Sequence, residues 1–557
     1  MTQIRLLIAG SLIAALTSCS SCAKKSGGAD AGDTGPTEAW LEGRVPGVKG
    51  TPTDGGTIVI RAMAEPDGLN FLDEAFRDGW TSRTMRNTVF EALLEIDPVD
   101  YSLKPQLAEK LIEHPDGLTQ TFHLRRGVKF HDGSDFTARD AVAVFDAVKD
   151  GKHPTESLAA DFVDLASWKA IDDFTLELKW KQVAPFALRQ VAKLPIYPAK
   201  SLSGDWASLA LARAPIGTGP FRFDSWKTGE QLTLKRFDGW WGGRPHLDQI
   251  TFRFVKDHTL ATTLFEKGVF DLMTNIQPTV WRAIEAPEPK HAWAQRGYNR
   301  LRSPDNSYSY IAWNEAVPFF ADARVRRALA MAYPSDQVSR GVDLGLELPT
   351  TCPYYLGSNK CDPSVKPFAY DPQKARALLE EAGFKDADGD GVLEKDGRPL
   401  RFRFIMQGTS VRLGKLVPLL QEAFKQMGVD LVPELVEGAV LSARLSKRDF
   451  EAVSKVWTEF DVEQDQFQVF HSSQIDGGSN WVGYSSAEAD ALLEKIRAEP
   501  DAAKRLELER ALHRRLYEDQ PYLFMTARQS LDAAKTRVHG ITPSLVWYDL
   551  RRVWVDP

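Results

Sequence analysis

Short runs of alternating polar and apolar residues recur along the chain and predict β-strands. A β-branched run, Ile58 to Ile60, follows the pair Gly55-Gly56, as is typical of a loop that leads into a buried strand. Alternation or a short apolar run predicts further strands at 120–130, 221–223, 231–235, 249–255 and 430–435. The first of these leads into a predicted turn at His131-Asp132-Gly133.

Apolar residues at helical spacing predict helices between these strands. The predicted helices span 84–96, 138–148, 323–331, 373–382, 416–427, 488–496 and 502–516. Thr137 is placed to cap the second helix, and Pro418 falls in the first turn of the fifth, where proline is tolerated. Interleaved helices and strands predict an α/β or mixed architecture, without any fixed-period repeat.

The N-terminal segment predicts export and a lipid anchor. Arg5 precedes an apolar stretch, 6–16, that is too short to span a bilayer. The stretch ends in Leu16-Thr17-Ser18-Cys19, which resembles the bacterial lipobox, whose cysteine receives a diacylglycerol and becomes the new N-terminus. We therefore expect residues 1–19 to be a lipoprotein signal peptide with Cys19 as the lipidation site. An ordinary signal peptide that contains cysteines is the alternative.

Composition bounds the rest of the chain. Residues 20–54 are rich in Ser, Gly, Lys, Asp and Pro, and this predicts a flexible tether. The whole sequence is 43% hydrophobic and 26% charged, which is typical of a globular protein, and its length favours several lobes. The net charge of −7 is mild and dispersed, so nothing favours a nucleic-acid partner. The body holds Cys352 and Cys361, which we expect to form a local disulfide in an oxidising compartment.

No catalytic or cofactor motif stands out. The sequence lacks His-Glu-x-x-His, Gly-x-Ser-x-Gly and a phosphate-binding glycine loop, so we predict a non-enzyme without a cofactor. The segment 386–391 resembles the start of a calcium loop, but Gly397 stands where such a loop needs a glutamate, and we favour an acidic turn with Glu394 nearby. His123 and His131 lack metal-spaced histidine neighbours, so structural roles are expected.

One long motif and several shorter ones carry a family resemblance. The motif is Phe-His-Leu-Arg-Arg-Gly-Val-Lys-Phe-His-Asp-Gly at 122–133, followed by Phe-Thr-Ala-Arg-Asp-Ala-Val at 136–142. Further matching segments follow in family order: 65–66 with 69–70, 90–93, 105–109, 217–221 with 226, 265–271, 324–329, 370–379, and 477–480 with 484 and 489–493. From Gly55 onward the chain resembles the extracellular solute-binding proteins of family 5, the dipeptide-, oligopeptide- and nickel-binding class of ABC importers.

The resemblance implies a two-lobed periplasmic-binding-protein-like fold of the class II type that closes on its ligand by a hinge. By analogy, lobe I comprises 55–98, 214–304 and 521–557, with 99–213 as an inserted subdomain, and lobe II comprises 305–520. The chain would cross between the lobes near Ser303–Asn306 and near Pro521–Tyr522. At 333–336 the family's usual Ala-Ile-Asp-Arg is replaced by Tyr-Pro-Ser-Asp, which puts the local helix geometry in question.

The resemblance also implies a ligand site around Trp457. Peptide-binding members place an aspartate three residues after this tryptophan to pair with the peptide's ammonium group, but here Phe460 stands there, flanked by Glu459 and Asp461. Asp465 aligns with a further family motif. The ammonium anchor is therefore displaced or missing, and on a strand we expect Phe460 to face inward. A core role for Trp457 and a solvated face for the acidic residues are the alternatives.

The function implied is that of the solute-binding component of an ABC importer, which captures peptides between its lobes and delivers them to the permease. The expected partners are the ligand and the permease and ATPase subunits; the protein would be a monomer that meets the membrane only through its lipid, on the periplasmic side of the envelope or the extracellular face. Two alternatives stay open. A receptor for an oligosaccharide or metal chelate fits the 15 tryptophans and the missing aspartate, and a sensory or cell-envelope lipoprotein would keep the fold without transport.

Overall fold

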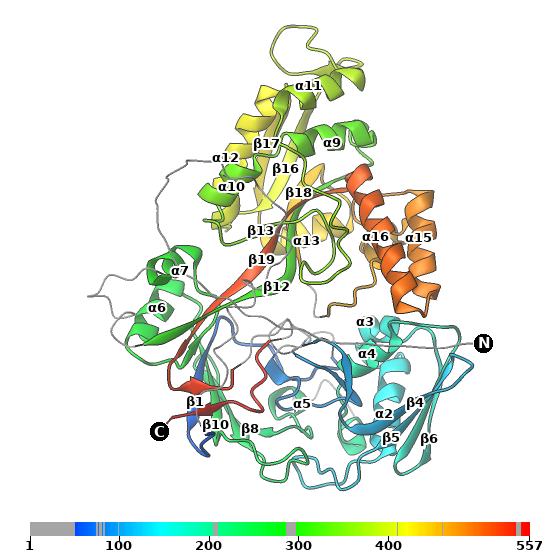
Figure 1. Cartoon of the computed structure of the whole chain (residues 1–557), viewed down its shortest axis with the longest axis vertical. Coiled ribbons are helices and arrows are strands. Elements are labelled where there is room, and N and C mark those ends of the chain that lie inside the picture. The colour runs from blue at the N-terminus through cyan, green and yellow to red at the C-terminus, as the bar shows by residue number, and fades with distance from the viewer. Residues whose placement is uncertain are drawn as a thin grey trace, which may run out of the picture.

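The chain folds into two lobes that meet along a shared β-sheet (Figure 1). The computed structural model describes residues 51–73, 76, 81, 84–98, 100–203, 210–285, 297–408, 410–458, 461–541 and 547–556. The predicted signal peptide, Cys19 and nearly all of the predicted tether lie outside these residues. None of the helices that the structure describes is both long and apolar enough to cross a membrane. The predicted α/β architecture is confirmed.

One 11-stranded sheet runs through both lobes, in the order β17-β16-β18-β12-β19-β11-β1-β10-β9-β8, with β13 paired to β19 beside this path. Its strands in lobe I are β1 (Thr57–Ala62), β8 (Phe221–Lys227), β9 (Gln231–Arg236), β10 (Gln249–Phe254) and β11 (Leu272–Met273). Its strands in lobe II are β13 (Leu348–Pro349), β16 (Arg401–Gln407), β17 (Asp430–Val436) and β18 (Ala452–Thr458). The strands predicted at 231–235, 249–255 and 430–435 are therefore confirmed.

Two long antiparallel strands, β12 (Tyr298–Trp313) and β19 (Tyr522–Lys535), connect the lobes. Their register shifts between Pro304 and Tyr308, where a proline cannot donate to the ladder. The irregularity falls on the predicted crossing at 303–306. On the returning strand, Tyr522 pairs with Ala312 inside lobe II, and Gln529 is the residue opposite Pro304.

Lobe I also contains a separate four-stranded sheet, in the order β4-β5-β7-β6. Its strands are β4 (Ala108–Glu113), β5 (Thr119–Leu124), β6 (Leu165–Asp172) and β7 (Thr175–Trp180). The other elements of this lobe are β2 (Leu94–Ile96), β3 (Leu103–Pro105), α2 (Ala138–Lys149), α3 (Glu156–Asp161), α4 (Ala187–Lys193), η3 (Ala199–Ser201), α5 (Ala210–Arg213), α6 (His258–Glu266), α7 (Pro278–Glu285), β20 (Val538–His539) and β21 (Trp554–Val555). Buried residues of this sheet, α2, α4, β1 and β10 form one hydrophobic core, so the inserted segment packs as part of lobe I.

Lobe II carries a core on each face of its sheet, because successive side chains of a strand point to opposite faces. Phe404 of β16 packs in one core and Ile405 in the other. The helices and remaining strands of this lobe are α9 (Ala323–Met331), α10 (Ser335–Gly341), α11 (Pro372–Glu381), β14 (Glu394–Lys395), β15 (Arg398–Pro399), α12 (Val411–Gln426), α13 (Gly438–Ser446), α14 (Phe467–Phe470), η4 (Ser472–Gln474), α15 (Ala487–Ala498) and α16 (Ala502–Asp519). Five of the predicted helices correspond to α9, α11, α12, α15 and α16.

The helix predicted over 84–96 is wrong. Asn87 adopts a left-handed backbone conformation (φ 58°), and the chain turns there before entering β2. The side chain of Gln106 holds this turn, since it donates to Asn87 Oδ1 at 2.9 Å and accepts the Ala92 N–H at 2.8 Å. The apolar spacing in this segment marks residues of the core and not one face of a helix. All five of its apolar residues are buried: Met85, Val89, Phe90, Leu93 and Leu94.

Two other local expectations are decided by helix caps. Thr137 precedes α2 as predicted, and the Asp140 carboxylate accepts its backbone N–H at 2.8 Å. The placement of Pro418 in a first turn is wrong, because Ser410 caps α12 and the helix begins at Val411, which leaves Pro418 inside it. Pro334 stands just before α10, in the short connection that follows α9.

His131 serves the structure, as expected. Its ring accepts the Gly217 N–H at Nδ1 (3.2 Å) and donates from Nε2 to the Gly219 carbonyl (2.9 Å). Burial lowers the pKa of His131 to about 4, so the ring stays neutral and bridges the turn before β8.

Candidate functional site

The candidate site lies at the carboxyl edge of the lobe II sheet. The strands β16 and β17 run parallel, and β16 is also parallel to β18. The chain that leaves β18 reaches Asp461, which contacts lobe I, so the carboxyl ends of all three strands face that lobe. In open α/β sheets ligands bind outside the carboxyl ends of the strands. Three apolar side chains are exposed near this edge: Val411 (75% exposed), Leu435 (63%) and Val440 (47%).

Trp457, near the end of β18, belongs to a stack of aromatic rings. Its ring lies 5.0 Å from that of Trp481 at an interplanar angle of 20°, and 6.4 Å from that of Tyr310 at 9°. Tyr310 in turn stacks on Tyr522 at 4.2 Å. Tyr310 and Tyr522 are buried, whereas Trp457 is partly exposed. The order of the rings is therefore Tyr522, Tyr310, Trp457 and Trp481, with the two tyrosines buried and the two tryptophans partly exposed.

Lys455 adds a cation on the face of β18 that carries Trp457. It stands two residues before Trp457, so the two side chains share one face of the strand, and its Nζ lies 5.6 Å from the ring centroid of Trp481. Burial lowers the pKa of Lys455. Lys455 was not among the predicted site residues, although its spacing from Trp457 on an extended segment was a usable signal.

Asp461 is buried and joined to lobe I. Its carboxylate accepts from Arg189 Nε at 2.8 Å on each oxygen and from Arg189 NH2 at 2.6 Å, and Lys193 Nζ lies 3.3 Å away. Burial of the carboxyl acts to raise its pKa, but Lys193 and Arg189 outweigh burial, and the pKa of Asp461 lies below its usual value. Asp461 is thus charged and already paired with two cations of α4.

The other predicted residues divide in two. Glu459 and Phe460 lie outside the described residues. Asp465 points to Arg497 of α15, whose Nε lies 3.0 Å from its carboxylate, and accepts the Phe467 N–H at 3.0 Å. Burial raises the pKa of Asp465, an effect that Arg497 opposes. The structure brings Trp457 and Asp461 to the carboxyl edge of the sheet and ties Asp465 into lobe II.

Cys352 and Cys361 form a disulfide, with their Cα atoms 5.8 Å apart. The adjacent Lys360 is buried and pairs with Glu463 (2.7 Å) and with Glu509 of α16 (2.8 Å). The disulfide loop is therefore held against the segment that follows Asp461.

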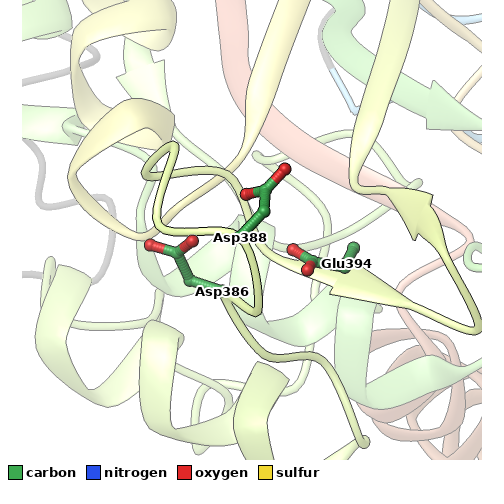
Figure 2. A group of neighbouring side chains, drawn as sticks. All are labelled: Asp386, Asp388 and Glu394. Carbon is green, nitrogen blue, oxygen red and sulfur yellow. The ribbon is translucent and has the colours of Figure 1, made fainter.

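An acidic group is formed by Asp386 and Asp388, on the loop between α11 and β14, and by Glu394, the first residue of β14 (Figure 2). Ligand oxygens from the three carboxylates all lie within 4.8 Å of one another. Each carboxylate also accepts a backbone N–H of the loop: Gly389 to Asp386 at 2.8 Å, Asp390 to Asp388 at 3.1 Å, and Ala387 to Glu394 at 2.7 Å. These bonds account for the acidic residues as turn formers.

Comparison with known proteins places the chain in one family. Residues 102–478 match the bacterial extracellular solute-binding proteins, family 5 Middle. The chain is 30% identical to the oligopeptide-binding protein AppA of Bacillus subtilis over 91% of this chain and 93% of the relative, and 24% identical to the dipeptide-binding protein of Escherichia coli over 87% and 91%.

Solved structures show the same fold. AppA in complex with a nonapeptide has a TM-score of 0.74 at 28% identity, covering 91% of this chain and 100% of that one. NikA of Brucella suis in complex with Fe(III)-EDTA has a TM-score of 0.80 at 23% identity, covering 90% and 100%. The predicted two-lobed class of fold is confirmed.

Proposed function

The chain belongs to the bacterial extracellular solute-binding proteins of family 5, and we propose that it captures a peptide between its lobes and delivers it to the permease of an ABC importer. The observation that carries the proposal is the match to AppA, an oligopeptide-binding protein, along nearly the whole of both chains. The solved complex of AppA with a nonapeptide makes an oligopeptide the ligand of first choice.

The chemistry of the carboxyl edge supports a peptide ligand. Trp457 and the exposed side chains Val411, Leu435 and Val440 offer apolar contact without selecting one side-chain shape. Lys455 supplies a cation near the same face, suited to a carbonyl or carboxylate of a ligand. Trp457, Glu459 and Phe460 remain the proposed ligand-contacting segment, with Lys455 added, while Asp461 borders it and is paired with Arg189 and Lys193.

The proposed motion is closure about the two strands that join the lobes. We place one hinge at the register shift between Pro304 and Tyr308, and the other at Gln529 on β19, opposite Pro304, instead of at Pro521. Lobe I would then comprise 55–304, including the inserted segment 99–213, together with the end of the chain after Gln529.

The cellular setting follows from the N-terminal motif and from the family. Cys19 carries the lipid in this proposal, residues 20–54 form the tether, and the protein is a monomer on the outer side of the membrane that it serves. Family members bind substrates and are not enzymes, and the permease and ATPase subunits are the expected partners.

Capture of a non-peptide solute is the second candidate. It is favoured by one observation: Asp461, the acid nearest the position of the family's ammonium anchor among the described residues, is already paired with Arg189 and Lys193. A solute without an ammonium group would need no free acid there.

Mass spectrometry of the ligand that co-purifies with the protein, followed by calorimetric titration with a nonapeptide, tests the proposal. Co-purified peptides and micromolar or tighter binding of the nonapeptide are the expected results. If the co-purified ligand is an oligosaccharide or a metal chelate, and nonapeptides do not bind, the peptide proposal is wrong and the second candidate replaces it.

A further inference from the structure

The two lobes touch through helix α4 of lobe I and the segment after β18 of lobe II. Ala187, Val191 and Ala192 of α4 are buried in the core of lobe I, which fixes the helix to that lobe. Arg189 and Lys193 are four residues apart and therefore lie on one helix face. Both reach Asp461, which we group with them as the interlobe ion cluster.

Each side of the cluster is held by further hydrogen bonds. Arg189 NH2 also donates to the Tyr101 carbonyl at 2.8 Å, so the guanidinium is oriented before it meets the carboxylate. The Asp461 backbone carbonyl accepts from Asn306 Nδ2 at 2.6 Å, and its carboxylate accepts the Glu463 N–H at 3.2 Å. Asn306 lies in β12 at the register shift, so the cluster is connected directly to the proposed hinge.

Two aromatic side chains of lobe I, in addition to the cluster, also contact lobe II. The ring of Phe186, which precedes α4, packs against the lobe II core and lies 5.7 Å from the guanidinium of Arg505. Tyr101 of lobe I meets Tyr355 of lobe II edge to face at 6.1 Å. In Figure 1, α4 lies on the side of lobe I that faces α15 and α16. The lobes are closed on each other along this edge.

The carboxylate of Asp461 has no capacity left for a ligand cation. Both oxygens accept from the guanidinium of Arg189, one is also close to Lys193, and only 3% of the side chain is exposed. An incoming ammonium group would have to displace a bidentate guanidinium, and this would leave a buried charge unpaired.

We propose that Arg189 and Lys193 pair with Asp461 in the place of a ligand's ammonium group. Asp461 then holds the two lobes together and does not recognise the amino terminus of a peptide. The inference rests on the proposed function for its ligand class, but the closure that it assigns to the cluster is a property of the protein alone. It implies a receptor whose lobe closure does not depend on a charged ligand terminus.

The substitution Asp461→Asn tests the closure, and lobe I offers a matched control in Asp271→Asn. Asp271 is equally buried (3% of the side chain is exposed), pairs with one lysine and one arginine, Lys535 (3.1 Å) and Arg537 (2.9 Å), and accepts one backbone N–H, that of Val59, at 2.8 Å. All of its partners lie within lobe I. Both variants should lose stability, but only Asp461→Asn should loosen the contact between the lobes.

The deciding measurement is small-angle X-ray scattering of the ligand-free full-length protein in detergent. We expect a larger radius of gyration for Asp461→Asn than for the wild type, and an unchanged value for Asp271→Asn. Equal values for the wild type and Asp461→Asn, or the same increase in both variants, would overturn the proposed closure.

A second measurement tests the ligand's amino terminus. A nonapeptide and its acetylated form should bind the wild type with dissociation constants that agree within about threefold. A loss above about tenfold on acetylation, or 1.4 kcal/mol, that disappears in Asp461→Asn would overturn the claim that Asp461 does not recognise the terminus. Failure of both peptides to bind contradicts the proposed function instead, and the scattering result then decides the closure by itself.

Discussion

Trp457 and Trp481 stack at 5.0 Å with their planes 20° apart, which joins the end of β18 to a loop that follows η4. The pair is continuous with Tyr310 and Tyr522, so two partly exposed tryptophan rings rest on two buried tyrosine rings. Such a support fixes the exposed rings before any ligand arrives, and preorganised contacts lose little entropy on binding.

Replacement of Trp457 separates a ligand contact from a core role. Trp457→Ala should weaken nonapeptide binding about tenfold, the effect of one stacked aromatic contact, while Trp457→Phe should keep most of the affinity. Calorimetric titration measures the binding, and urea unfolding measures the stability. Wild-type affinity in the alanine variant, together with a large loss of stability, would make Trp457 a core residue only.

Glu91 gives lobe I a predicted pH dependence. It is buried, and its carboxyl group accepts hydrogen bonds from Trp241 (2.8 Å), Trp240 (3.0 Å) and Thr218 (2.8 Å). Burial raises the pKa of Glu91 to about 7 despite these bonds. The folded state binds the Glu91 proton more tightly than the unfolded state does, so protonation of Glu91 stabilises the fold. This contribution to the free energy of unfolding is complete below the unfolded pKa, near 4.5, and is lost as pH rises toward 7.

A pKa rise of this size corresponds to about 3 kcal/mol of unfolding free energy lost across that window. Urea unfolding at pH 5, 6, 7 and 8 would measure it, and Glu91→Gln should flatten the slope whatever its absolute stability. The same slope in the wild type and in Glu91→Gln would assign the pH dependence to other groups.

The disulfide should be present in the exported protein. A loop this short removes little unfolded-state entropy, so replacing Cys352 and Cys361 together by alanine should cost about 2–3 kcal/mol. Thiol titration of the denatured, unreduced protein should find no thiol from this pair. Two reactive thiols beyond those of the N-terminal region would show that the bond does not form in the cell.

Cys19→Ala should release the protein from the membrane. The substitution removes the predicted lipid acceptor, which is the membrane attachment that the proposal assigns to the protein. Cell fractionation and labelling with a radioactive fatty acid measure the two consequences, with Cys22→Ala as the control that should stay lipidated. Membrane retention of an unlabelled Cys19→Ala variant would contradict the anchor.

Local pattern predicted the strands and most helices because alternation and helical spacing report which side of an element is buried. It failed at Thr84 to Ile96, where the turn at Asn87 is stabilised by Gln106, a residue outside the predicted helix. Lys455 could have been predicted from its spacing to Trp457. The pairing of Arg189 with Asp461 could not, because the two residues are separated by 272 positions and no periodic pattern links them.

The position of β19 has a consequence for how the chain acquires its structure. This strand begins at Tyr522, close to the C-terminus, yet it lies in the middle of the sheet between β12 and β11. The two halves of the sheet therefore cannot join until almost the whole polypeptide has been synthesised, and contacts between such distant residues form slowly. A chain that ends before Tyr522 would lack the strand that links the halves, so it should expose unpaired edges of β12 and β11, whereas a chain that ends after Lys535 would keep the link.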